Sequence, residues 1–286
     1  MRSELFSIGS LDVHGYGFML GLGFLLCVIM CGYRAKKYNL SPDAILDIAL
    51  WGITTGLLGA KLLFVIVEFP AFLEDPLSVL GSAGFVVYGG IIAGVSSAII
   101  YCRVKKFEFL RYFDLAAPGI ALAQGFGRIG CFLAGCCYGR ETDSWCGVVF
   151  PVGGQAPAGV KLLPTQLFSS AGDFIIMAVL IFYHKRSKRA GDVGALYMLL
   201  YGVGRFIIEF FRSDERGAVG AISTSQCISI GIVIGAIVLF ICNGKRAKKT
   251  VLKDNIDDSS NADKNINNDN NLINEIGENQ EKNQIN

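Results

Sequence analysis

The feature that most constrains this chain is a series of seven long apolar runs separated by polar segments. Each run holds roughly 20 mostly apolar residues, the length that an α-helix needs to cross the hydrocarbon core of a membrane. A spanning segment has to satisfy its own backbone hydrogen bonds, so helices are expected. The sequence therefore predicts an all-α integral membrane protein with about seven transmembrane helices. The runs lie at residues 15–33, 46–67, 83–102, 114–134, 167–183, 193–211 and 222–242.

Composition agrees with this prediction. The chain is 52% hydrophobic and only 17% charged, whereas about a quarter of the residues of a soluble domain are charged. The fourth and sixth runs are marginal because they contain arginine. The first run, Tyr16 to Gly32, is followed by its positive cluster and has no small-residue cleavage site, which favours a permanent span over a signal peptide. No basic domain stands apart from the apolar runs, which argues against a nucleic-acid partner.

Lysine and arginine in the loops predict the orientation of the chain in the membrane. Fifteen of them follow the first, third, fifth and seventh runs, within residues 34–37, 103–111, 185–189 and 245–249. The opposite side holds five: Arg2, Arg140, Lys161, Arg212 and Arg216. This alternation predicts seven spans, with the N-terminus outside and the C-terminus in the cytoplasm.

Two further segments lie outside the spans. Residues 250–286 are rich in Asn, Asp, Glu, Lys and Gln, a composition that buries too little apolar surface to fold. We expect a membrane domain over residues 1–249 and a disordered cytoplasmic tail over 250–286. The longest loop, about residues 135–166, is expected on the outer face, and loops of this length are usually functional or disordered.

Ionisable residues inside a membrane cost roughly 2.5–3.5 kcal/mol each on insertion scales, so each needs an explanation. Arg205 and Glu209 are four residues apart in GRFIIEFFR, which places them on one helix face where they can pair; Tyr201 extends that face. The pair either locks two helices together or lines a polar site. Lys61, in GLLGAKLLF, either adds positive charge to the same cavity or extends its amine to the interface.

Arg128 lies in the glycine-rich sequence AQGFGRIGCFLAGCCYG. Glycine permits close helix approach or a broken helix end. The arginine fork matches phosphate oxygens. A phosphate at membrane depth is therefore the predicted partner of Arg128. The alternative is tight packing, with the arginine extending toward the outer interface.

Four cysteines, Cys131, Cys136, Cys137 and Cys146, lie close together in the sequence. Their spacing matches no common zinc pattern, so no metal site is predicted. A disulfide within the outer loop, such as one between Cys137 and Cys146, stays open. Neither histidine is expected to be catalytic, since His14 precedes the first span and His184 belongs to a basic cluster.

The run GFGRIGCFLAGCCYGR resembles the signature of the bacterial prolipoprotein diacylglyceryl transferases, typically GRxGNFxNGExxGR. DLAAPGIALAQGFGRIG matches the approach to that signature. Further similar segments follow the family's order, and the resemblance covers roughly residues 8–242. They are Gly59-Ala60-Lys61, similar to GAR; Pro164-Thr165-Gln166, similar to HPTQ; Gly204-Arg205 to Arg212, similar to R-x3-EFFR; and Ser225-Gln226, at the entry to the last span.

The resemblance implies a function. Members of this family transfer a diacylglyceryl group from phosphatidylglycerol to the lipobox cysteine thiol of a secreted preprotein, and glycerol phosphate leaves. The implied partners are phosphatidylglycerol, the prolipoprotein signal peptide with its lipobox cysteine, and membrane lipids. The implied location is the bacterial cell membrane, with several spans, and no metal or organic cofactor is implied.

The resemblance also implies roles for particular residues. Arg128 would bind the phosphate of phosphatidylglycerol, and Arg205 with Glu209 would complete the polar cavity. Tyr16, in GYGF, matches a functional tyrosine, and Gly139 matches the last glycine of the signature. Lys61 and Gln166 complete the set of residues expected to bind substrate, and Tyr88 occupies the catalytic position of the family's HGG motif.

The chain departs from the family pattern at four positions: Tyr88 replaces the HGG histidine, Cys131 the signature asparagine, Cys136 the signature glutamate and Leu163 the HPTQ histidine. An ordinary tyrosine, with a pKa near 10, is a poor general base. Either another group takes the thiol proton, Glu209 being one option, or the substrate arrives as thiolate, or the chain is a divergent homologue that acts on a different acceptor. Two other classes stay open, a divergent non-catalytic lipid-binding homologue and a small transporter. Many transporters show paired repeats, and none is visible in this sequence.

Overall fold

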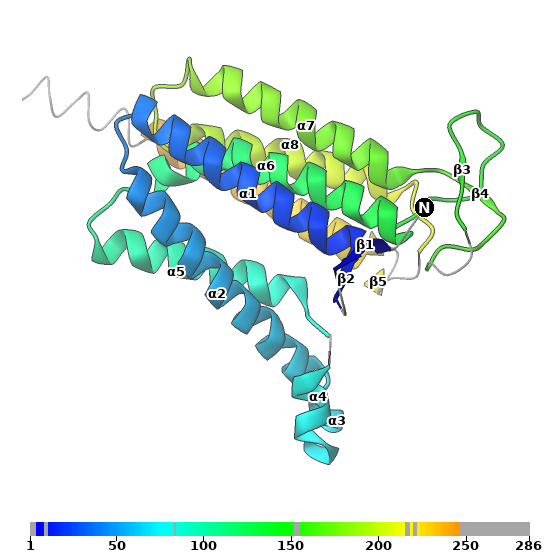
Figure 1. Ribbon diagram of the computed structural model, residues 1–286. Helices are drawn as coiled ribbons and strands as arrows, with labels where there is room; N and C mark the ends of the chain where they lie inside the picture. The colour runs from blue at the N-terminus through cyan, green and yellow to red at the C-terminus, as the bar shows by residue number, and fades with distance from the viewer. Residues whose placement is uncertain are drawn as a thin grey trace, which may run out of the picture. The chain divides into compact units, whose positions relative to one another are not determined.

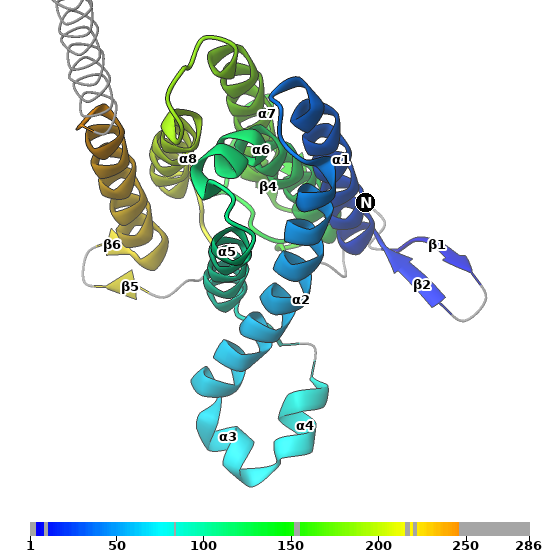
Figure 2. The ribbon, with the colours of Figure 1, turned by 90° about the vertical axis from the view of Figure 1, so that its left-hand side faces the viewer.

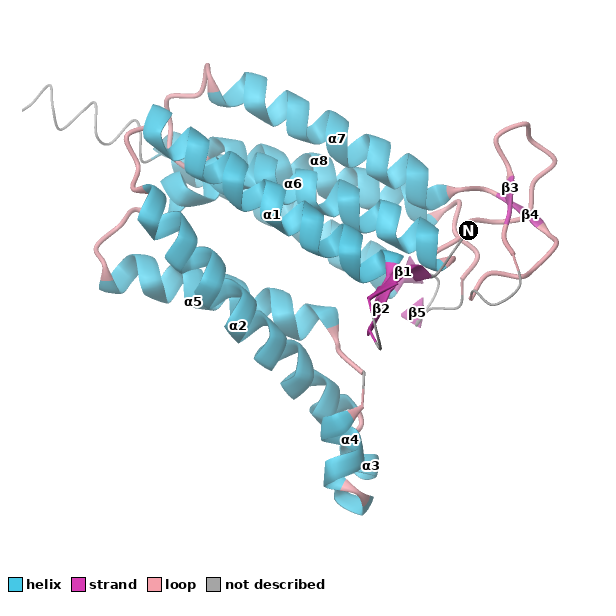
Figure 3. Cartoon of the chain, in the orientation of Figure 1, coloured by secondary structure: helices cyan, strands magenta, loops and turns pink. Residues whose placement is uncertain are grey.

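The computed structural model describes residues 4–8, 11–82, 84–151, 155–214, 218–219 and 222–245. The chain divides into two units, Met1–Leu239 and Phe240–Asn286, and nearly all described residues belong to the first. The expected tail over residues 250–286 lies outside the described residues, as do Arg2 and Arg216. Helices dominate the described part (Figure 3).

All seven apolar runs form long helices in the structure, as predicted. Their bounds are α1 Gly15–Lys37, α2 Pro42–Val67, α5 Val87–Val104, α6 Phe109–Ala134, α7 Thr165–His184, α8 Asp192–Glu209, and a last helix Thr224–Lys245. Two short helices that the sequence did not predict, α3 Phe69–Glu74 and α4 Pro76–Gly81, connect α2 to α5.

The described part is mostly helical, as predicted, and three short antiparallel hairpins accompany the helices. They are β1 Glu4–Ile8 with β2 Leu11–His14, β3 Val148–Val149 with β4 Lys161–Leu162, and β5 Ala218–Val219 with β6 Ile222–Ser223. β3 and β4 lie within the long segment between α6 and α7. That segment is therefore partly ordered by strand pairing rather than an irregular loop throughout.

Five described helices are long and apolar enough to cross a membrane: α1, α2, α5, α7 and the last helix. α6 and α8 fall outside this group. They contain Arg128 and Arg205, the residues that made the fourth and sixth runs marginal in the sequence. Large apolar side chains such as Leu50, Leu58 and Leu62 of α2 are about two-thirds exposed, as expected for a surface that faces lipid rather than water.

Helix α6 lies at the centre of a bundle and contacts α1, α7 and α8 (Figures 1 and 2). α2 and α5 pack on each other as a separate pair, and α1 also contacts α2. Between α2 and α5 the backbones approach closely at Gly56 and Gly90, where a Cβ on Gly90 would lie 3.0 Å from the Gly56 oxygen. Small residues are typical of such helix contacts in membranes.

A buried carboxylate fixes α8 against α6. The two Asp114 oxygens of α6 accept hydrogen bonds from the backbone nitrogens of Gly191, at 2.6 Å, and Gly194, at 2.7 Å. These are among the amides at a helix N-terminus that have no partner within the helix. The contact sets the start of α8 and so determines which of its side chains turn toward α6.

Candidate functional site

The site is built around Arg128, which lies near the C-terminal end of α6 and is partly buried. Three helices bring side chains within electrostatic range of its guanidinium: Tyr16 from the first turn of α1, Asp173 from α7 and Tyr201 from α8. Cys131 and Cys137 lie in the same range. Tyr16, which the resemblance marks as a functional residue, therefore lies in electrostatic range of Arg128.

Gly130 makes the approach of α1 to α6 possible at this point. A Cβ at Gly130 would lie 3.2 Å from the Cα and from the carbonyl oxygen of Tyr16, so a side chain would push the helices apart. Both atoms belong to the backbone of α1 and cannot turn away. This glycine thus sets the distance between Arg128 and the start of α1.

Asp173 is a residue of the site that the sequence analysis missed. Its side chain is 6% exposed, and its Oδ2 is buried without a hydrogen-bond partner in the described part of the chain. The nearby positive charge is that of Arg128. The rule that intramembrane carboxylates need an explanation would have found Asp173, had it been applied to the fifth apolar run.

The segment after α6 is held by the start of α7. α6 ends at Gly135, whose φ of 68° lies in the left-handed region. Gln166 donates from Nε2 to the carbonyl of Cys136 at 2.7 Å, and Thr165 donates from Oγ1 to the carbonyl of Cys137 at 2.9 Å. Gln166 is 1% exposed, and its Oε1 is buried without a hydrogen-bond partner among the described residues. Gln166 therefore holds the backbone of this segment.

Gly139 lies where this segment touches the backbone before α7. Its nitrogen donates to the Leu163 carbonyl at 3.0 Å. A Cβ would lie 2.7 Å from the Thr165 Cγ2 and 2.8 Å from the Leu163 oxygen. The match to the last glycine of the signature thus has a steric basis.

We expect Gly139→Ala to lower the stability of the protein in detergent by about 1–3 kcal/mol, the usual cost of overpacking. Gly172→Ala is the matched control, because an added Cβ there meets nothing within 4 Å and alanine favours the helix. Thermal unfolding of the two variants measures the difference. Equal melting temperatures would contradict the steric account of Gly139.

Three thiols come together beside Arg128. The Sγ atoms of Cys131, Cys136 and Cys137 lie within 4.8 Å of one another. Hydrogen bonds from Cys131 and Cys136, with the Arg212 guanidinium, lower the pKa of the Cys137 thiol, whereas the neighbouring thiols and burial raise that of Cys136. All nine cysteines of the chain are described and none of them forms a disulfide, so the bond considered between Cys137 and Cys146 is not formed here.

Arg205 and Glu209 form the predicted ion pair within α8. Arg205 Nη1 lies 2.6 Å from Glu209 Oε2, and the side chains are 11% and 7% exposed. Arg205 Nη2 also donates to Ser225 Oγ of the last helix at 2.8 Å. The pair therefore links two helices, the first of the two roles considered for it, and Tyr201, one turn earlier, is the α8 residue near Arg128.

Tyr88 and Lys61 lie on the α2–α5 pair. Tyr88 is 42% exposed in the first turn of α5, and no hydrogen bond or ion pair joins it to Arg128 in the described part of the chain. Lys61 Nζ donates to the Ser82 carbonyl at 2.7 Å and to that of Gly84 at 3.4 Å, so it holds the connection that enters α5. Neither alternative considered for Lys61 anticipated this contact.

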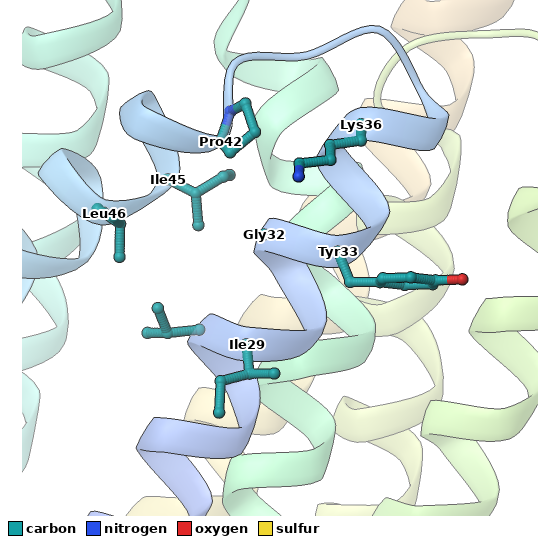
Figure 4. A pocket seen from close by; sticks show the side chains of 8 residues that line it. Ile29, Gly32, Tyr33, Lys36, Pro42, Ile45 and Leu46 are labelled. Atoms are coloured by element: carbon teal, nitrogen blue, oxygen red, sulfur yellow. The ribbon is translucent and has the colours of Figure 1, made fainter.

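A pocket of about 300 Å³ opens between α1 and α2 (Figure 4). Its lining is mostly apolar, and Lys36 is the one charged side chain among its described lining residues. Tyr33 lines the pocket and Tyr16 adjoins Arg128, so the two places are roughly 25 Å apart along α1, at 1.5 Å per residue. The described lining of the pocket includes none of the predicted site residues.

Comparison with known proteins finds relatives that match most of this chain. The family model described as prolipoprotein diacylglyceryl transferase matches residues 3–242. A phosphatidylglycerol--prolipoprotein diacylglyceryl transferase of Clostridium tetani is 45% identical over 251 residues, 87% of this chain and 100% of the relative. Enzyme 2 of Clostridium perfringens is 44% identical over 87% of this chain and 98% of the relative. The phosphatidylglycerol--prolipoprotein diacylglyceryl transferase of Finegoldia magna is 35% identical over 88% of this chain and 98% of the relative.

These relatives are covered over nearly their whole length, and the match includes the segment around Arg128 and the ion pair of α8. The helical architecture and the thiol-rich signature lie inside the matched region. This chain is a member of the prolipoprotein diacylglyceryl transferase family.

Proposed function

We propose that this chain transfers the diacylglyceryl group of phosphatidylglycerol to the lipobox cysteine thiol of a prolipoprotein. Family membership and relatives that carry this name support the reaction. The observation that carries the proposal to particular residues is the partly buried Arg128, which no described residue neutralises by a direct ion pair. A phosphate diester is an anion of the size and charge that an arginine fork binds.

In this reaction the thiol sulfur attacks the carbon of the diacylglyceryl group that is bonded to the phosphate oxygen. A carbon–sulfur bond forms, the carbon–oxygen bond breaks, and glycerol phosphate leaves with the electron pair. Arg128 stabilises the charge that grows on the leaving phosphate, an electrostatic effect that is strong in a site that excludes water. Tyr16 lies beside that charge, and Arg205 with Glu209 fixes α8, which brings Tyr201 to Arg128.

The thiol proton goes to a carboxylate in this proposal, because a phenol is a poor general base for a thiol. Glu209, paired with Arg205, and Asp173, near Arg128, are the two acceptors to compare. The amide variants Glu209→Gln and Asp173→Asn separate them. In the variant that has lost the base, we expect transfer to rise with pH toward the thiol pKa of about 8.5. Unchanged pH profiles in both would contradict the carboxylate assignment.

We also propose seven spans in the bacterial cell membrane, with the N-terminus outside and the C-terminus inside. The loop charges support this orientation, and all seven apolar runs are helical. A membrane-impermeant maleimide is expected to label Cys146, between α6 and α7, in intact cells. A Lys188→Cys variant, between α7 and α8, should be labelled only after permeabilisation. The reverse pattern would contradict the orientation.

The transfer itself is tested with the purified protein, phosphatidylglycerol labelled in its acyl chains and a lipobox peptide. We expect a labelled thioether product with the cysteine peptide and none with its serine counterpart or with phosphatidylethanolamine as donor. Binding of phosphatidylglycerol without transfer would favour a non-catalytic lipid-binding homologue. Movement of a solute across vesicles without transfer would favour a transporter.

A further inference from the structure

The side chains of Cys131, Cys136 and Cys137 cluster together, although the three residues belong to two different parts of the backbone. Cys131 belongs to the last turns of α6, and the other two belong to the segment that follows it. All three Sγ atoms lie within 4.8 Å of one another. In a tetrahedral zinc site with bonds of about 2.3 Å, two thiolate sulfurs lie about 3.8 Å apart, so small side-chain movements complete the geometry.

The backbone that carries the thiols is held before any ligand binds. Cys137 has a φ of 64°, in the left-handed region, and the Cys136 nitrogen donates to the Cys131 carbonyl at 3.1 Å. Gln166 and Thr165 clamp the carbonyls of Cys136 and Cys137 from α7. A site whose ligands are positioned by surrounding hydrogen bonds loses less order when a metal binds.

The surrounding charges also suit a metal held by thiolates. Three thiolates and one divalent cation leave a net charge of −1. The Arg212 guanidinium contacts the Cys137 thiol, and Arg128 lies in electrostatic range of Cys131 and Cys137. Arg212 is also paired with Asp214 at 2.8 Å, so the cation that faces the negative charge of such a complex is chiefly Arg128.

We propose that Cys131, Cys136 and Cys137 bind one thiophilic divalent cation of the zinc class. Soft thiolate ligands select such ions over magnesium or calcium. Three protein ligands leave the fourth tetrahedral position for a ligand from outside the trio. The sequence spacing gave no zinc pattern because two ligands are adjacent and the third comes from the preceding helix. The site does not depend on the transferase reaction, and its test involves no lipid transfer.

The test uses the full-length protein in detergent, reduced and freed of metal, and titrated with Cd²⁺. We expect one equivalent to bind, with an ultraviolet thiolate-to-cadmium charge-transfer band. Replacing Cys131, Cys136 or Cys137 by serine, one at a time, should remove most of the band. Cys146→Ser is the matched control, because Cys146 lies in the same segment but outside the trio, with its Sγ in a hydrogen bond with the Ser144 hydroxyl. This variant should bind as the wild type does.

A second measurement on the wild type avoids any variant that fails to fold. Bound Zn²⁺ should slow maleimide alkylation of the three thiols and leave alkylation of Cys146 unchanged, as followed by peptide mass spectrometry. Absence of stoichiometric binding by the reduced wild type would overturn the proposal. So would binding that persists when a member of the trio is replaced, or equal protection of all four cysteines.

Discussion

Arg128→Ala is expected to lower the rate of diacylglyceryl transfer by about a hundred- to a thousandfold, the usual cost of removing one preorganised donor from a developing charge. Arg128 is the cation on which α1, α6, α7 and α8 converge. Alanine would leave the leaving phosphate unstabilised and Asp173 without its nearest positive charge. The measurement is the transfer rate at saturating phosphatidylglycerol and saturating lipobox peptide.

Two further variants show whether the effect is specific to the guanidinium of Arg128. Arg128→Lys keeps the charge but loses the planar fork, so we expect an intermediate rate. Arg103→Ala removes an exposed arginine at the end of α5 and should transfer at the wild-type rate. An Arg128→Ala protein as active as the wild type would remove Arg128 from the mechanism.

Glu209→Ala is expected to destabilise the folded protein by about 3–5 kcal/mol, because it removes the carboxylate that balances the buried charge of Arg205. The pair is 2.6 Å apart, and both side chains are nearly buried. Removing both charges, in Arg205→Met with Glu209→Gln, should cost less than the sum of the single changes. The measurement is the free energy of unfolding of each purified single variant and of the double variant, relative to the wild type. Helical circular dichroism monitors the unfolding in detergent.

The surface ion pair between Arg111 and Glu108 serves as a control for this cycle, because both of its side chains are more than half exposed. Its removal should cost at most about 1 kcal/mol. Glu209→Ala with a stability within that same range would show that the α8 pair does not hold the last helix in place.

The helices could be predicted from the sequence because a segment that crosses lipid must be long, apolar and internally hydrogen-bonded. Every apolar run became a helix, and the spacing of Arg205 and Glu209 was enough to predict their ion pair. Arg128 and Gly139, which the resemblance singled out, lie near the end of α6 and at the backbone contact before α7, and their roles stay predictions. These features depend on local periodicity or on short motifs.

Features that depend on tertiary packing could not be read in this way. The short helices α3 and α4 are too brief to give a periodic signal, and Lys61 contacts carbonyls about twenty residues away. The convergence of the three thiols requires the left-handed backbone at Gly135 and Cys137. Asp173 was within reach of the sequence, since a carboxylate in an apolar run is a signal in its own right.

The lipid phosphate is expected at the end of α6, and a photoreactive phosphatidylglycerol with its diazirine on the headgroup tests that position most directly. After illumination of the wild-type protein, mass spectrometry would locate the adducts. We predict adducts in α6 from Gln124 onward and in the first turn of α1, and competition by unlabelled phosphatidylglycerol. Adducts confined to residues 28–46, around the pocket between α1 and α2, would contradict the assignment of Arg128 as the phosphate site.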